Sequence, residues 1–384
     1  MTVDSSKLPA RVMTVLAVLA VTLFPAAMIL RHDFPQAGPS MVHLVMAVGI
    51  MPLIMGAMIY FTPVLTRSRA AGWPLFLAPL LALVAGVLVS VGLFWRRDLL
   101  PIPAVLAMVA TGILLGWMSY RARTMLGRPH PGLAWYRWAL VCLLLGLTAI
   151  FVATLLPEFW ATLRRFHLHV NLLGFVGLAA LGTLRVLIPT AAGYVDPDAH
   201  ARLHGDLYLV VTGSLLIATG SAWLTWLVWP GVALWLIPLG RFAMALATSR
   251  RKLVWGWHRP AASLGLAVLG LPTVLIASGL HAIDARHVGA SLSLFFFIFL
   301  FPLVTGAVSY LLPVWLWPGR QGAVYESSAR RLAWGSGMRS LVFFAAGVMA
   351  WSGMPEAVYL AAAGVLTFLF QVAWVLGSRF SSSI

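Results

Sequence analysis

The chain has 384 residues, of which 61% are hydrophobic and only 9% are charged, and its formal net charge is +16. A soluble domain carries roughly 25% charged residues, so this composition excludes a soluble globular protein and predicts an all-α polytopic membrane protein. Cys142 is the single cysteine, which excludes an internal disulfide and a cysteine-based metal site.

Apolar runs of about 20 residues mark the candidate membrane-spanning helices. In chain order they cover residues 12–30, 41–64, 73–94, 101–120, 135–156, 167–189, 207–227, 228–248, 260–280, 288–316, 339–353 and 356–377. The longest polar connections between them are 190–206 and 317–338. We therefore expect twelve transmembrane helices in a single membrane domain that covers residues 1–384.

Three of these helices share one residue pattern, in which a polar residue is followed by a glycine 13 positions later and a proline 20 positions later. The copies are His43–Gly56–Pro63, His169–Gly182–Pro189 and Ser293–Gly306–Pro313. They are offset by 126 and then 124 residues. A repeat of this length predicts three pseudo-symmetric units of four helices, at approximately 12–128, 135–250 and 260–377, with the patterned helix second in each.

The basic residues predict how the helices are oriented in the membrane. Six of the 26 Lys and Arg residues fall in loops after odd-numbered helices: Arg31, Arg96, Arg97, Arg164, Arg165 and Arg286. The other 20 are assigned to the loops after even-numbered helices and to the two ends of the chain. Lys and Arg are in excess on the cytoplasmic side, so we expect both termini there, in a multi-pass protein of the bacterial cytoplasmic (inner) membrane. This asymmetry accounts for the high positive net charge, so we expect a lipid bilayer as partner and no nucleic acid.

Six of the ten histidines are then expected toward the outer face: His32, His43, His167, His169, His281 and His287. A histidine inside a membrane helix is costly and indicates a functional site. His43 and His169 occupy the same position in two repeats, so we expect them at matching depth. His167 and His169 lie about 200° apart around a helix, so they would serve opposite sides of it. The alternative is that each histidine satisfies a polar contact within the helix bundle.

The segment HLHVNLLGF, at residues 167–175, is followed by Gly182 and Pro189. This pattern resembles a helix of the catalytic subunit of the heme–copper oxidases, in particular the cbb-type oxidases and the nitric oxide reductases. The twelve-helix layout also resembles this cytochrome c oxidase subunit I-like superfamily, including the NnrS-type membrane proteins of the nitric-oxide response. The resemblance implies a b-type heme near the outer face, and a role in electron transfer or in handling nitric oxide or another diatomic gas.

For the site, the resemblance implies that His43 and His169 are axial ligands of the heme iron, with His167 as a further candidate. The heme propionates would need cations at the outer face. Four candidates lie there: Arg96, Arg97, Arg164 and Arg165. An equal alternative is that these arginines flank helix ends and reach lipid headgroups.

The chain also departs from the oxidases. Their H-x-H pair lies on the tenth helix, whereas here it lies on the sixth, and Ser291 and Ser293 fill the matching positions of the tenth. The outer end of the seventh predicted helix, residues 221–229, has no histidine. An oxidase-type copper center therefore cannot be assembled, and we do not expect a terminal oxidase. Any enzymatic activity would be that of a heme-dependent oxidoreductase, with a periplasmic or membrane electron-donor protein as a possible partner.

Two other function classes remain open. The second class is a copper-handling protein or a small-molecule transporter on the same scaffold. Copper is suggested by five methionines on the helix of His43, because thioether and imidazole groups suit Cu(I): Met41, Met46, Met51, Met55 and Met58. Methionine is also a common gap-filler in apolar packing. The third class is a cofactor-free assembly subunit, in which the histidines would be dispensable.

Two smaller expectations concern single side chains. His281, Asp284 and His287 lie close in sequence beside an outer loop and could form a small metal site. Arg185 lies four residues before Pro189 and is expected to reach the cytoplasmic interface.

Overall fold

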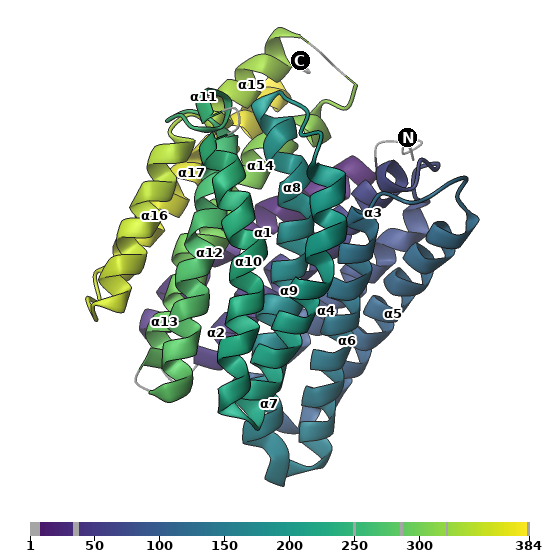
Figure 1. The fold of residues 1–384 in the computed structure, drawn as a ribbon. Helices are drawn as coiled ribbons and strands as arrows, with labels where there is room; N and C mark the ends of the chain where they lie inside the picture. Colours follow the sequence, from purple (N-terminus) through teal and green to yellow (C-terminus); the bar gives the residue numbers. More distant parts are fainter. Residues whose placement is uncertain (1–7, 34–37, 249–250, 285–286, 320–321, 382–384) are drawn as a thin grey trace. The chain divides into compact units, whose positions relative to one another are not determined.

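The computed structural model describes residues 8–33, 38–248, 251–284, 287–319 and 322–381. It is 88% helical, and no strand occurs among these described residues. Within these described ranges, twelve helical segments are long and apolar enough to cross a membrane, which confirms the predicted all-α class and the number of spans (Figure 1). Helices suit this solvent because each one satisfies its own backbone N–H and C=O groups within the segment.

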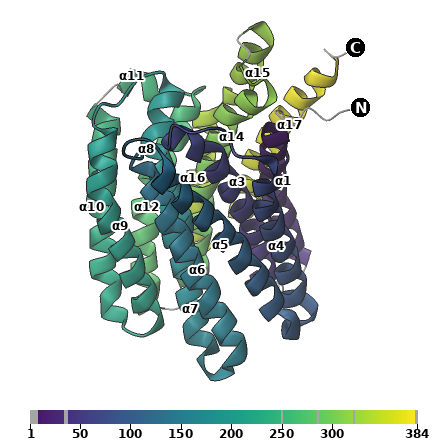
Figure 2. The same ribbon diagram turned by 90° about the vertical axis from the view of Figure 1, so that its right-hand side faces the viewer.

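The chain forms two compact units, Met1–Thr183 with Asp198–Trp235 and Leu184–Pro197 with Leu236–Ile384. The first unit begins with α1 (Leu8–Asp33), α2 (Gly38–His43), η2 (Leu44–Ile50), α3 (Met51–Leu65), η3 (Trp73–Phe76), α4 (Leu77–Trp95), η4 (Arg97–Leu99) and α5 (Pro101–Thr124). It continues with α6 (Gly132–Leu155), η5 (Pro157–Phe159), α7 (Trp160–His169), η6 (Val170–Gly177), α9 (Ala199–Ala222) and η7 (Thr225–Leu227). Within this unit α4, α5 and α6 lie side by side (Figures 1 and 2).

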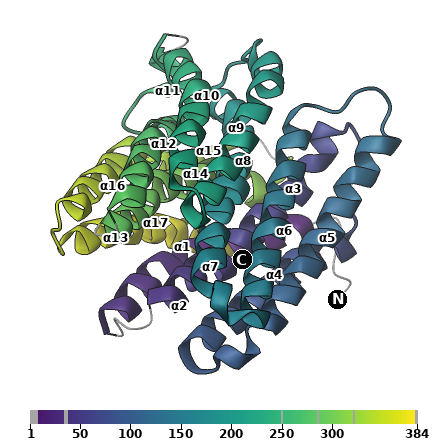
Figure 3. The same ribbon diagram turned by 60° about the horizontal axis from the view of Figure 1, so that its bottom comes forward.

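Two helices contain a boundary between the units, so that each contributes residues to both: α8 (Leu178–Ala192) and α10 (Val228–Thr248). The second unit also contains α11 (Arg251–Val254), α12 (Pro260–Ile283), α13 (Val288–Leu294), η9 (Phe295–Leu300), α14 (Phe301–Leu316), α15 (Ala323–Ala333), α16 (Ser336–Trp351) and α17 (Ala357–Ser381). Figure 3 shows α12, α13 and α16 packed together within it. Both α11 and α15 lie at the end of this unit opposite α13 (Figure 1).

A π-helical segment interrupts each of the three patterned helices at nearly the same place. The segments η2, η6 and η9 begin at residues 44, 170 and 295, so their starts are 126 and 125 residues apart. Pro52 and Pro302 follow two of them in the first turn of α3 and α14. Proline has no N–H for the carbonyl four residues earlier and clashes with it, which favours a local widening of the helix. Leu178 takes the matching position after η6, so no proline explains that copy.

The repeated glycine of each patterned helix lies against the first helix of its own predicted four-helix unit. A Cβ atom on Gly56 would lie 2.8 Å from Met13 Sδ, one on Gly182 would lie 2.6 Å from Trp135 Cβ, and one on Gly306 would lie 2.9 Å from Ser263 Cβ. Small residues of this kind let membrane helices approach closely. The glycine of the sequence pattern is therefore a helix-packing residue in all three copies.

Some helix boundaries differ from the prediction. Helix α9 begins at Ala199, inside the predicted connection 190–206, and α15 lies inside the predicted connection 317–338. The start of α9 and the whole of α15 carry several charged or polar residues, so a search for apolar runs does not find them. Helix α9 ends at Ala222, whereas the predicted span continued to residue 227. The chain turns at Trp223 inside an apolar stretch, so composition gives no sign of this helix end.

The prediction that Arg185 reaches the membrane interface is wrong. Arg185 is only 2% exposed, its Nη2 donates to the Pro238 carbonyl at 3.0 Å, and its guanidinium lies 4.0 Å from the centroid of the Phe242 ring. Helix α8 continues past Pro189 to Ala192, which leaves Arg185 about two turns from the helix end. A carbonyl and an aromatic face on α10 surround the charge instead of headgroups.

Candidate functional site

The rings of His43 and His167 lie close together in the first unit. His43 is the last residue of α2 and His167 lies on the last turn of α7, and these two helices are found at the same end of the unit (Figures 1 and 3). The ring centroids are 6.3 Å apart and the ring planes are 11° from parallel. Two imidazoles that bind one transition-metal ion from opposite sides, with metal–nitrogen bonds of about 2.0–2.1 Å, have centroids about 6 Å apart. The separation therefore fits a bis-histidine metal site.

Both rings are held through the Nδ1 atom. His43 Nδ1 lies 2.8 Å from the Pro39 carbonyl oxygen, and His167 Nδ1 lies 2.9 Å from the Gly146 carbonyl oxygen. A carbonyl oxygen only accepts a hydrogen bond, so each Nδ1 carries the proton and each Nε2 carries a lone pair. Among the described residues, no hydrogen bond occupies Nε2 of either ring. This is the tautomer that ligates a metal through Nε2, with Nδ1–H bound to a second group that orients the ring.

Asn171 and Gly146 both contact Nδ1 of the His167 ring. Asn171 Nδ2 lies 3.1 Å from His167 Nδ1, while Asn171 Oδ1 is buried without a hydrogen-bond partner among the described residues. Because Nδ1 already donates to Gly146, it cannot accept from this amide, and the amide is best satisfied when its oxygen faces the ring. A Cβ atom on Gly146 would lie 2.7 Å from Asn171 Nδ2. The absence of a side chain at Gly146 therefore makes room for Asn171.

His169 is placed differently from the two paired rings. It is 7% exposed, and its Nδ1 donates to the Arg165 carbonyl at 2.8 Å, within its own helix. Since His167 faces His43, helix geometry turns His169 about 200° away from that direction. The ring contact of His43 is thus with His167 and not with the expected partner two residues later. The sequence indicated that the two histidines of the H-x-H pair face opposite ways, but not which of them faces His43.

The four arginines proposed for heme propionates are all exposed. Arg96 already forms an ion pair with Asp98, with Nη2 and Oδ2 2.8 Å apart and both side chains at least 60% exposed. This carboxylate raises the pKa of Arg96, which lies outside the membrane spans. Arg164 and Arg165 lie on α7 one turn before His167 and His169, and Arg165 Nε donates to the Ala161 carbonyl. Arg97 is in η4, and Arg286 lies outside the described residues.

Larger metal clusters are not found in the part of the chain that the structure describes. No group of three or more His, Cys, Asp or Glu side chains there is arranged to hold a metal ion. In the predicted outer cluster, His287 Nε2 lies 3.9 Å from Asp284 Oδ2, and the His287 ring stacks on Trp351 with centroids 5.0 Å apart. Together with His281, these residues do not form such a group.

The sequence prediction did not include the residues that hold the two rings. Pro39, Gly146 and Asn171 carry no metal-ligating chemistry of their own, so residue type gives no reason to select them. Only Asn171 had a local signal, since it lies one helical turn after His167 and its amide can reach that ring.

Comparison with models of known protein families gives no match, and comparison with curated proteins gives none either.

Proposed function

We propose that this chain is a heme b-binding protein of the membrane, in which His43 and His167 are the axial ligands. The observation that supports it is the pair of parallel rings with centroids 6.3 Å apart, each held by a backbone carbonyl at Nδ1. The donor set fits such a group, since both Nε2 lone pairs are available in the tautomer that these carbonyls impose. The heme–copper oxidase resemblance of the 167–175 segment points to the same cofactor.

A b-type heme would supply a one-electron couple at its iron. The protein would tune that couple through the ligands, their hydrogen bonds and burial. The carbonyls of Pro39 and Gly146 make both imidazoles more basic by accepting hydrogen bonds from their Nδ1–H groups. His43 and His167 would both hold the iron. We therefore favour electron transfer over direct binding of nitric oxide or another diatomic gas as the role of this site.

The copper-handling alternative has less support. Met55 and Met58 are 0% and 1% exposed, so they pack in the core instead of lining an open path. The helix contact at Gly56 also involves the thioether of Met13, in keeping with methionine as a packing residue. We therefore keep copper only as a metal to be measured in the same preparation.

The direct test is a reduced-minus-oxidised absorption spectrum of the full chain purified in detergent, with metal analysis of the same sample. We expect Soret and alpha bands of a b-type heme that are lost in His43→Ala and in His167→Ala. His204→Ala is the matched control, because this histidine is exposed on α9. A wild-type protein that stays colourless after growth with added heme precursor, or bands that survive both ligand variants, would overturn the proposal.

A further inference from the structure

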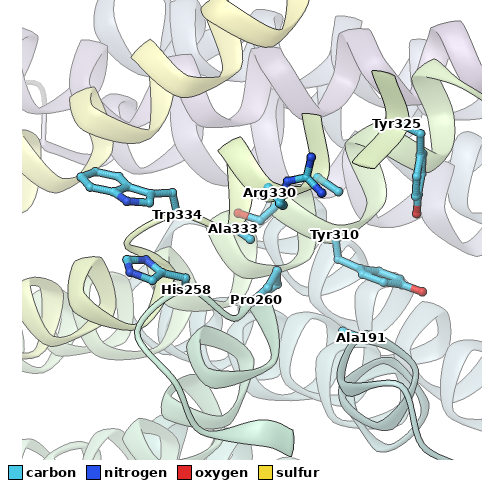
Figure 4. A pocket seen from close by; sticks show the side chains of 10 residues that line it. Ala191, His258, Pro260, Tyr310, Tyr325, Arg330, Ala333 and Trp334 are labelled. Atoms are coloured by element: carbon cyan, nitrogen blue, oxygen red, sulfur yellow. The ribbon is translucent and has the colours of Figure 1, made fainter. Parts of the chain in front are cut away.

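A second candidate site lies within the second compact unit, at the end where α15 is found. A pocket of about 480 Å³ is lined by residues of α8, α12, α14 and α15 and of the segments beside them. Figure 4 shows Arg330 in its middle, with the Trp334 and His258 rings on one side and the Tyr310 and Tyr325 rings on the other. Pockets of this size hold small molecules or parts of them. Nothing in the heme proposal involves these residues.

A buried cation lies directly behind the wall of this pocket. Arg339 is 5% exposed, and its Nη2 lies 3.4 Å from the hydroxyl oxygen of Ser309, which lines the pocket. Ser309 donates its own proton to the Thr305 carbonyl, so it accepts from the guanidinium. The positive charge is thus one hydrogen bond away from the pocket.

The neighbours of Arg339 leave this charge uncompensated. Its Nη1 donates to Gln371 Oε1 at 3.0 Å, its guanidinium lies 4.5 Å from the centroid of the Phe368 ring, and its Nε is buried without a partner. In the described part of the chain, no carboxylate pairs with it. A desolvated cation without a counter-ion is costly, and its field extends further in a low-dielectric surrounding than in water. An anion in the adjacent pocket would offset that cost.

The mouth of the pocket supplies further donors. The Arg330 side chain is 72% exposed, and its Nη1 lies 3.5 Å from Glu326 Oε2. This ion pair is weak because both side chains are exposed to solvent. The hydroxyl groups of Tyr310 and Tyr325 are on the same side of the pocket (Figure 4). The Trp334 ring is 61% exposed and stacks on His258 with centroids 5.8 Å apart. An exposed tryptophan beside a cation is typical of the membrane–water interface.

We propose that this pocket binds a phosphate group. The Arg330 guanidinium and the hydroxyl groups of Tyr310 and Tyr325 offer more hydrogen-bond donors than the two oxygens of a carboxylate require. Arginine also binds two oxygens of one phosphate group through two parallel hydrogen bonds. The basic loops predict that this end of the chain is cytoplasmic, where anionic lipids gather. The phosphate can come from an anionic phospholipid headgroup or from a soluble phosphate ester, and both present the same chemistry to the pocket.

The test uses the full chain in an uncharged detergent and two probes with the same headgroup. Dihexanoyl phosphatidic acid carries the phosphate on a lipid, and glycerol 3-phosphate carries the same phosphomonoester without acyl chains. Binding is measured by isothermal titration. We expect Arg330→Gln to weaken binding about tenfold, the effect of losing one charge-assisted contact to phosphate.

Arg331→Gln is the matched control. It removes the same charge from the same helix, but Arg331 lies over the Trp374 ring, 5.1 Å from its centroid, and not in the pocket. Ser309→Ala tests the connection to Arg339 without removing a buried charge. It should also weaken binding, and its melting curve in detergent shows whether the fold is intact.

The outcomes separate the two sources. Binding of both probes, with both weakened by Arg330→Gln, supports a site for soluble phosphate esters as well as lipids. Binding of the lipid probe alone supports a headgroup site. The proposal is overturned if neither probe binds, or if Arg331→Gln weakens binding as much as Arg330→Gln does.

Discussion

The rings of His43 and His167 lie parallel to within 11°, with their centroids 6.3 Å apart, although 124 residues separate them in the chain. Each ring is fixed through Nδ1 by a backbone carbonyl, one from its own helix and one from α6. The repeat pattern aligns His43 with His169, yet the facing ring belongs to the other histidine of the H-x-H pair.

The first prediction concerns which histidine pairs with His43. We expect His169→Ala to keep the spectrum of a heme with two histidine ligands, because His169 faces away from His43 and bonds to Arg165. His167→Ala should lose it. Electron paramagnetic resonance of the oxidised variants distinguishes the two ligation states. The reverse result, with loss only in His169→Ala, would restore the pair implied by the oxidase resemblance.

The second prediction concerns the support of His167. In Gly146→Ala the new Cβ would lie within 2.8 Å of both Asn171 side-chain heteroatoms, and overpacking of this kind costs about 1–3 kcal/mol. We expect a lower heme-to-protein ratio and a lower melting temperature. Gly112→Ala on the adjacent helix α5 is the control, since nothing lies within 4 Å of the new atom. Equal heme content in the two variants would show that Asn171 does not position the ring.

The third prediction ranks the repeated glycines. Gly182→Ala should cost about 1–3 kcal/mol of stability, because the new methyl meets Trp135 Cβ, which is held by its own backbone. Gly56→Ala should cost less, because Met13 can move its flexible thioether away. Thermal unfolding in detergent measures both, with Gly240→Ala, which meets nothing within 4 Å, as reference. The same loss in both variants would contradict this ranking.

The fourth prediction concerns pH. His130 lies outside the spans, its Nδ1 accepts from the Gly132 N–H at 3.1 Å, and its ring centroid is 6.0 Å from that of His200. Burial lowers the pKa of His130 from 6.5, and repulsion from His200 lowers it further. A lowered pKa of a base means that the unfolded chain binds the proton more readily. The contribution to stability is therefore present above pH 6.5 and is lost as pH falls through the lowered pKa.

We expect the melting temperature of the wild-type protein to fall between pH 7 and pH 5 more steeply than that of His130→Gln. The exposed His204→Gln variant should behave like the wild type, which separates His130 from a general effect of histidine removal. Parallel pH profiles for wild type and His130→Gln would show that this histidine does not contribute.

The sequence by itself determined the class of the protein and its twelve spans. Each span must pair its backbone N–H and C=O groups by internal hydrogen bonds and must keep its apolar side chains out of water. Both requirements are met within about 20 consecutive residues. The repeated glycines were visible for the same reason, since spacing along one helix is a local property. The boundaries of α9 and α15 were missed where polar turns are helical, because composition no longer distinguishes helix from loop there.

Only the tertiary structure decided which side chains meet. The rotation of each helix about its axis is set by packing against its neighbours, so the sequence could place His167 and His169 on opposite sides of a helix but could not say which one faces His43. The same holds for Arg185 and Arg339, whose partners lie on other helices. Gly146 and Asn171 came into the site through one contact between α6 and the start of η6, and no pattern along the chain records that contact.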